Sequence, residues 1–246
     1  MKLIKRCITM MLVLAMFGNI NVITMAKDKN IILEQAPEYY SKEHLNEMKK
    51  NNIKIDKYIK ENYSNEKLDE ISIKSGANKN LTVPLYQQEK DYYCGPASAK
   101  MLLKYVKGTL YTQASLATAM GTTRSNGTLV YKLTNTLNSK LGSSEYEYVL
   151  DSDYEFGNSL IYCIDKSKPI VCHVDTSALP IYNGTSCGHY IVSIGYSWYA
   201  SGSSGYSKVK YNDPNWNNAY FGTYTCDVDE MRDAINLKAG YYIRAK

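Results

Sequence analysis

The alternation of apolar and polar residues changes along the chain and predicts helices first and strands later. Apolar residues recurring every three or four positions predict helices over about 95–106, 112–120, 127–139, 153–166 and 227–237. Shorter apolar or alternating runs predict strands at 146–150, 168–174, 189–198, 206–212 and 241–244. The run 199–205, rich in Ser and Gly, predicts a hairpin tip. Helices followed by antiparallel strands are typical of an α+β domain.

The part of the chain before Leu81 has a different composition. Between residues 27 and 80, charged residues and Asn dominate, and one helix is predicted over about 41–58. The last six residues, 75–80, have the Ser, Gly and Asn content of a linker. We expect 27–80 to be a solvated spacer or a pro-segment that masks the site. Residues 81–246 are expected to form one domain, long enough to bury a core.

Residues 1–26 are predicted to be a secretory signal peptide. Lys2, Lys5 and Arg6 precede an apolar run at 8–17, which is too short for a confident membrane span. Small residues at the −3 and −1 positions predict cleavage after Ala26. The mature protein is therefore expected to be secreted or held at the cell surface, without a stable membrane span.

Charge and cysteine content narrow the classes of partner and of site. Removal of residues 1–26 takes away three basic and no acidic residues, so the formal net charge falls from +5 to +2. Basic and acidic residues are interspersed, which gives no support for a nucleic-acid partner. Five cysteines remain, and this odd number leaves at least one thiol unpaired. If Cys94 is that thiol, the other four form zero, one or two disulfides: Cys163, Cys172, Cys187 and Cys226.

Cys94 has the sequence setting of a reactive thiol. It begins a predicted helix. Pro96 falls in the first turn of that helix, where the N–H that proline lacks is not needed. Free backbone N–H groups and the positive end of the helix dipole stabilise a thiolate there. Gln88, six residues earlier, can place a side-chain amide as a fixed donor to a developing oxyanion. The same pattern, however, also fits a cysteine buried in the core.

His189 and Asp213 supply the other two groups that a cysteine nucleophile needs, a base and a residue that orients the base. His189 begins one predicted strand and Asp213 ends the next. If the two strands form a hairpin, the nine residues 189–197 pair with the nine residues 205–213. This pairing places His189 and Asp213 at the same end of the sheet. The carboxylate then accepts from one imidazole nitrogen while the other nitrogen faces Cys94.

Other candidates have weaker patterns. His173 and Asp175 share one face of a strand, but a partly buried strand histidine is the simpler interpretation of His173. Cys187 is expected to be structural, and His44 to be a surface residue outside the domain. A metal site of Cys94, His189 and Asp213 has suitable ligand types but lacks their usual local spacing, so no metal or cofactor is predicted.

Taken together, Gln88, Cys94-Gly-Pro-Ala-Ser, Gly188-His189-Tyr-Ile-Val and Asp213-Pro214 resemble the papain-like cysteine peptidases. They are most similar to the bacteriocin-processing branch, the thirty-nine-like family of double-glycine leader peptidases, and the resemblance covers about 81–246. It implies an α+β papain-like fold in which an N-terminal catalytic helix packs on an antiparallel sheet. It also implies that His189 takes the proton of Cys94, and that Gln88 and the Cys94 backbone N–H bind the oxyanion.

The resemblance leaves three functions open. The first is an exported cysteine peptidase that acts on a peptide or protein. The second is an acyl-transfer enzyme or amidase with the same residues, and the third is a non-catalytic surface binding module. Leader peptidases of this kind are often fused to transporter and ATP-binding domains. No Walker-type loop or membrane helix is predicted here, so a double-glycine substrate is not assumed.

Overall fold

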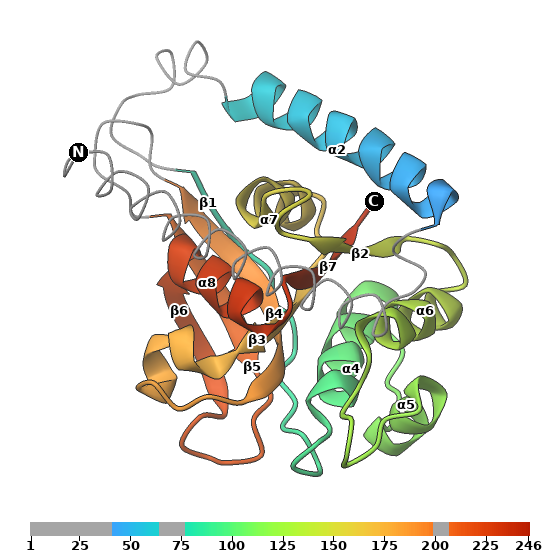
Figure 1. Ribbon diagram of the computed structural model, residues 1–246, viewed down its shortest axis with the longest axis vertical. Coiled ribbons are helices and arrows are strands. Elements are labelled where there is room, and N and C mark those ends of the chain that lie inside the picture. Colours follow the sequence, from blue (N-terminus) through green and yellow to red (C-terminus); the bar gives the residue numbers. More distant parts are fainter. Residues whose placement is uncertain (1–40, 64–76, 199–206) are drawn as a thin grey trace, which may run out of the picture.

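The computed structural model describes residues 41–63, 77–198 and 207–246 (Figure 1). The predicted signal peptide and hairpin tip lie outside these residues. The helices are α2 (Lys42–Tyr63), α4 (Cys94–Lys107), α5 (Gln113–Met120), α6 (Val130–Leu141), α7 (Phe156–Asp165) and α8 (Val228–Lys238). The strands are β1 (Ala77–Asn80), β2 (Tyr146–Leu150), β3 (Ile170–Asp175), β4 (Gly188–Trp198), β5 (Lys208–Asp213), β6 (Gly222–Asp227) and β7 (Tyr241–Ala245). Two 3-10 turns, η2 (Thr176–Ala178) and η3 (Pro180–Tyr182), link β3 to β4.

The strands form one antiparallel sheet in the order β2-β7-β3-β4-β5-β6. β4 is the longest strand. It pairs with β5 along one edge, and with β3 and then β1 along the other edge. β4 therefore joins both halves of the sheet, and its N-terminal end carries the residues that face α4.

Helix α4 packs on β4 and groups with α5 and α6 beside the sheet (Figure 1). Its inward face is apolar, with Met101, Leu102 and Leu103 fully buried. Ser98 fixes the start of the helix on the sheet, because its hydroxyl donates to the backbone oxygen of Tyr190 at 3.2 Å. The predicted α+β arrangement, with the Cys94 helix packed on an antiparallel sheet, is confirmed.

Two strands were not predicted. Residues 77–80, interpreted as the end of a linker, form β1 and pair with residues 195–198 of β4. The β1 backbone approaches Gly195 so closely that a side chain there would collide with the Lys79 carbonyl and with Asn80. β6 lies in a stretch for which no strand was predicted, and it pairs with β5 along its whole length. Both strands form because long-range backbone pairing overrides their weak local pattern.

Helix α2 belongs to the folded unit, and the interpretation of its sequence as a solvated tail is wrong. It lies along α7 (Figure 1), with Met48 and Ile55 buried. The hydroxyls of Tyr58 and Tyr63 both donate to the carboxylate of Asp165 at the end of α7. These contacts bury one face of α2 against α7 and leave the opposite face exposed, so the buried face stabilises the packing of this helix.

A buried ion pair lies beneath α2. Arg244 and Glu147 are 0% and 2% exposed, and an Arg244 guanidinium nitrogen lies 2.9 Å from Oε1 of Glu147. Asn51 of α2 donates to the second oxygen of Glu147, and Asn52 accepts from Arg244. The two asparagines thereby satisfy polar groups of the pair that would otherwise be unpaired once α2 covers them.

We expect Glu147→Gln to destabilise the protein by roughly 3–5 kcal/mol, because it leaves the Arg244 charge buried without its counter-ion. The matched control is Glu61→Gln. It breaks the exposed pair of Glu61 with Lys57 on α2, and such a pair contributes about 0.3–0.5 kcal/mol. Chemical denaturation of both variants checks the difference. Similar small losses in the two variants would contradict the role assigned to the buried pair.

Candidate active site

Cys94 is the first residue of α4 and is partly exposed. No side chain caps the start of this helix among the described residues, so its first backbone N–H groups face the cleft uncapped. Gly95 lies against Thr128, where any side chain would collide with the threonine. Thr128 is in turn bound through its backbone oxygen by the Tyr190 hydroxyl, at 2.9 Å. The start of α4 is therefore fixed by the segment before α6 and by β4 as well as by its own helix.

His189 and Asp213 meet at the end of the β4–β5 hairpin. Nε2 of His189 lies 2.8 Å from Oδ1 of Asp213, and the two residues are 4% and 0% exposed. The predicted register was wrong, because Val192 pairs with Asn212, two positions from the expected partner. A shift by an even number of residues keeps each side chain on its face of the sheet. The imidazole and carboxylate consequently meet diagonally, on one face, instead of directly across the ladder.

The pKa of His189 is set by burial and by Asp213. Burial alone would lower the pKa, because it disfavours the charged imidazolium. The negative charge of Asp213 and its hydrogen bond outweigh that effect and, with the hydrogen bond and charge of Cys94, raise the pKa to about 10. Nε2 is occupied by Asp213, which leaves Nδ1 for the cysteine. The raised pKa keeps a proton on the imidazole at neutral pH.

Asp213 has a complete set of donors besides His189. Its Oδ2 accepts from the Tyr182 hydroxyl at 2.7 Å, and its Oδ1 accepts from the Asn215 backbone N–H at 2.9 Å. The Asn215 side chain donates to the Tyr182 oxygen at 2.9 Å. Sequence reasoning missed both residues. Asn215 carries a weak signal, since it lies two residues after the carboxylate, whereas Tyr182 lies in a predicted loop that gave none.

Gln88 is buried and lines the same cleft as Cys94 and His189. Its Nε2 donates to the Lys90 backbone oxygen at 2.8 Å, which leaves the second N–H of the amide available to a ligand. The loop around it is fixed by Gln113, whose amide donates to the Gln87 oxygen and accepts from the Glu89 N–H. Gln113 was also missed, because a buried glutamine on α5 gives no sequence signal for this contact.

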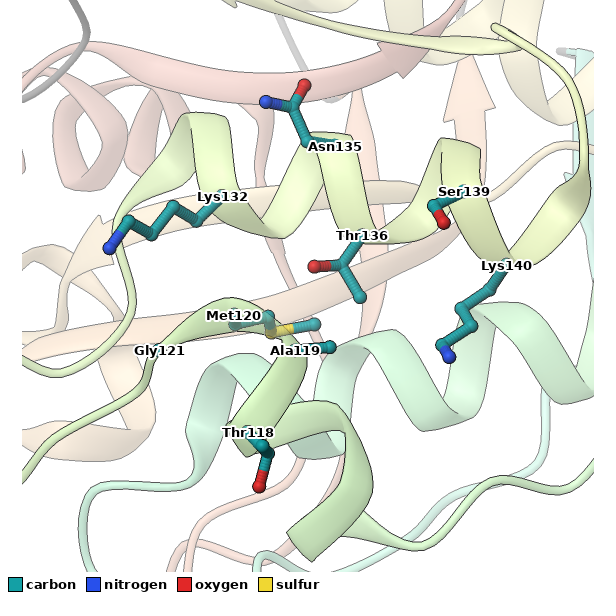
Figure 2. A pocket seen from close by; sticks show the side chains of 9 residues that line it. All are labelled: Thr118, Ala119, Met120, Gly121, Lys132, Asn135, Thr136, Ser139 and Lys140. Atoms are coloured by element: carbon teal, nitrogen blue, oxygen red, sulfur yellow. The ribbon is translucent and has the colours of Figure 1, made fainter.

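The cleft has a volume of about 410 Å³, and Gln88, Cys94 and His189 line it together. A hollow between α5 and α6 is somewhat larger, at about 470 Å³ (Figure 2). Its lining includes Lys132, Asn135 and Lys140 but no Cys, His, Asp or Glu. Of these two hollows, only the first is lined by cysteine and histidine side chains.

The remaining candidates fall outside the Cys94–His189–Asp213 chain of contacts. His173 lines the cleft, and its ring stacks on that of Tyr190 with 4.4 Å between the ring centroids. Burial lowers the pKa of His173 to about 3, so its imidazole stays neutral. Asp175 accepts hydrogen bonds from Ser177 and Ser186 at the start of η2. His44 is partly buried and stacks on Tyr148, which contradicts its interpretation as a residue outside the domain.

The five cysteines after the predicted cleavage site are free thiols: Cys94, Cys163, Cys172, Cys187 and Cys226. Cys187 is exposed and lines the cleft, with the Thr176 hydroxyl 3.4 Å from its sulfur. Within residues 41–63, 77–198 and 207–246, no cluster of three His, Cys, Asp or Glu side chains could hold a metal ion. None of the helices in these ranges combines the length and the apolar character that crossing a membrane requires.

The model of the Peptidase_C39 like family matches residues 80–236. Among solved structures, the chain is similar to a C39-like peptidase from Bacillus anthracis, with 16% identity and a TM-score of 0.49 over 69% of this chain and 98% of that one. It is also similar to the peptidase domain of Streptococcus ComA, a bifunctional ABC transporter, with 19% identity and a TM-score of 0.44. That match covers 66% of this chain and 97% of the ComA domain. A recombinant stem bromelain precursor is similar with 15% identity and a TM-score of 0.40, over 89% of this chain and 99% of that one. No curated protein matches the chain.

Asp213→Asn is expected to slow alkylation of Cys94 by iodoacetamide at pH 6 by at least about tenfold. Without the carboxylate, only Cys94 opposes the effect of burial, so the pKa of His189 falls. Each pKa unit lost makes the charged Cys94–His189 pair tenfold rarer relative to the neutral pair. Above pH of about 8.5 an ordinary thiol ionises by itself, so the two rates should converge.

Asp175→Asn is the matched control, because it removes a nearby carboxylate that does not contact His189. Its alkylation rate at pH 6 should stay within about twofold of the wild type. Equal rates at pH 6 in wild type and Asp213→Asn would show that the His189–Asp213 contact does not govern the thiol.

Proposed function

We propose that this chain, which belongs to the Peptidase_C39 like family and is therefore a cysteine peptidase, cleaves peptide bonds with Cys94 as nucleophile and His189 as base. Asp213 orients the base in this proposal, and Gln88 is a donor of the oxyanion hole. The observation that carries it is the 2.8 Å contact of His189 with Asp213 in the cleft that Cys94 also lines.

The reaction begins with transfer of the Cys94 proton to His189. The Cys94 sulfur attacks the carbonyl carbon of the scissile bond, and the carbonyl oxygen becomes an oxyanion. The Cys94 backbone N–H and the second N–H of the Gln88 amide donate to that oxygen. As the C–N bond breaks, the imidazolium gives its proton to the leaving amine, and an acyl-thioester remains on Cys94.

Hydrolysis of the thioester uses the same residues. Neutral His189 takes a proton from a water molecule, which attacks the thioester carbonyl, and the sulfur leaves as a thiolate. Asp213 stabilises the imidazolium that forms in both halves of the reaction and keeps the ring oriented. Tyr182 and Asn215 hold the carboxylate in place throughout.

The substrate class in this proposal is a peptide or protein met outside the cytoplasm. Export is supported by the basic residues, apolar run and small-residue cleavage site within residues 1–26. Residues 42–63 form α2, and none of them lines the cleft, so this helix does not mask the site.

The test is cleavage of a peptide library by the purified protein, with products identified by mass spectrometry. Cys94→Ala and His189→Ala should each lower kcat/KM by at least about 10³-fold. Cys187→Ser is the matched control, since it removes the other thiol of the cleft and should leave the rate within about twofold.

The products also separate the alternatives. A free carboxyl product supports hydrolysis, whereas acyl groups appearing on an added amine would favour an acyl-transfer enzyme. A Cys94 that does not react with iodoacetamide, in a protein that cleaves no peptide, would overturn the peptidase and favour a binding module.

Gln88→Ala is expected to lower kcat roughly 10²- to 10³-fold, because it removes a donor to the oxyanion. Its Cys94 should still be alkylated by iodoacetamide at the wild-type rate, since alkylation passes through no oxyanion. Gln87→Ala is the control: the Gln87 amide donates to Trp216 and Asn218, and its loss should leave kcat nearly unchanged. Equal losses of kcat in the two variants would argue for a structural role of the loop.

A further inference from the structure

One charge in the cleft has no part in the proposed reaction. Besides the residues of the proposed reaction, several ionisable side chains line the cleft. Two of them, Asp91 and Arg124, form an ion pair, so their charges largely cancel. His173 is neutral, because its pKa is lowered to about 3. Lys238 is the remaining fixed charge of this lining, and it is positive.

Lys238 ends α8, and its side chain lies directly over Gly188, the residue before His189. A Cβ added to Gly188 would stand 2.5 Å from Nζ and 2.6 Å from Cε of Lys238. The ammonium group therefore lies beside the proposed base, where only a residue without a side chain leaves room for it. A substrate that reaches Cys94 has to pass close to this group.

The Lys238 ammonium forms no ion pair with any carboxylate among the described residues. Its positive charge nevertheless acts on the surroundings, since it contributes to the lowered pKa of both His173 and Asp175. Asp175 is the carboxylate whose pKa Lys238 lowers, but its oxygens accept hydrogen bonds from Ser177 and Ser186. The charge is thus available to a ligand.

An exposed aromatic residue lines the same cleft. Trp216 is 59% exposed, and its backbone oxygen is bound by Gln87 at 3.0 Å, which fixes the start of its loop. A cation and an exposed apolar ring along one cleft suit a ligand with a carboxylate and an apolar group close together.

We propose that Lys238 is a specificity-determining residue that binds a substrate carboxylate flanking the scissile bond, so that the protein prefers acidic peptides. The inference rests on the proposed function, because it assigns a substrate class to the same site. A charge-assisted hydrogen bond in a partly desolvated cleft is expected to raise kcat/KM roughly tenfold over the same peptide with an amide.

The experiment compares peptides that differ only in Glu, Gln or Lys at each position next to the cleaved bond. Wild type should prefer Glu over Gln roughly tenfold at one position, and Lys238→Gln should abolish that preference. Lys238→Glu should reverse it in favour of Lys. Lys132→Glu is the matched control, since it makes the same change in net charge in the hollow of Figure 2, and it should keep the wild-type preference.

A second readout does not depend on peptide cleavage. Iodoacetate and iodoacetamide alkylate Cys94 by the same reaction, but only iodoacetate carries a carboxylate. The ratio of the two rates should fall several-fold in Lys238→Gln while the iodoacetamide rate stays unchanged. If no peptide is cleaved but the ratio falls, the proposed function fails and the carboxylate site stands. If peptides are cleaved and neither the preference nor the ratio changes in the Lys238 variants, the inference is overturned.

Discussion

The buried carboxylate of Asp213 is the constraint on which the site depends. A charge taken fully out of water is costly unless donors surround it. Here the donors come from three separate parts of the chain: His189 of β4, Tyr182 of η3 and the backbone after β5. Each part has to be in position for the charge to be tolerated. The strand register, the η3 turn and the loop after β5 are thus coupled to one another through a single carboxylate.

This coupling also sets the chemistry. The same negative charge that needs donors holds a proton on the imidazole, against the effect of burial. In the proposed reaction that proton goes to the leaving amine, while the helix N-terminus and Gln88 donate hydrogen bonds to the oxyanion. The segments that carry Cys94, His189 and Gln88 are fixed by contacts of Ser98, Thr128 and Gln113, which involve no substrate. The site is therefore largely preorganised.

A second set of polar contacts lies under α2. Arg244 and Glu147 are buried against asparagine side chains, and the partly buried Asp165 accepts from tyrosine hydroxyls. This second set shares no residue with the cleft lining. Both networks follow one rule, that buried charges require complete sets of partners, but they serve different ends. The first raises the pKa of His189. The second fixes a charged helix to the sheet and so extends the folded unit beyond the matched family region, 80–236.

Local pattern was sufficient for most elements of the fold. Helix α4 was predictable from its apolar spacing and Pro96, and α8 from a capping box in which Asp227 and Glu230 do exchange hydrogen bonds. Cys94, His189 and Asp213 were identifiable because each lies at the end of an element, where a side chain can face a cleft. What these residues do in the reaction is still a prediction.

The sequence by itself thus determined the α+β class, most of the helices and strands and the candidate residues, because each depends on neighbours within a few positions. Only the tertiary structure decided the pairing of β1 and β6, the shifted β4–β5 register and the docking of α2. It also decided the Tyr182 contact of Asp213, which joins residues 31 positions apart. The loop around Gln88 is fixed in the same way, because Gln113 bonds the backbones of Glu89 and Gln87 from 24 and 26 positions away. Contacts over such distances depend on the packing of the whole sheet, and no local pattern encodes them.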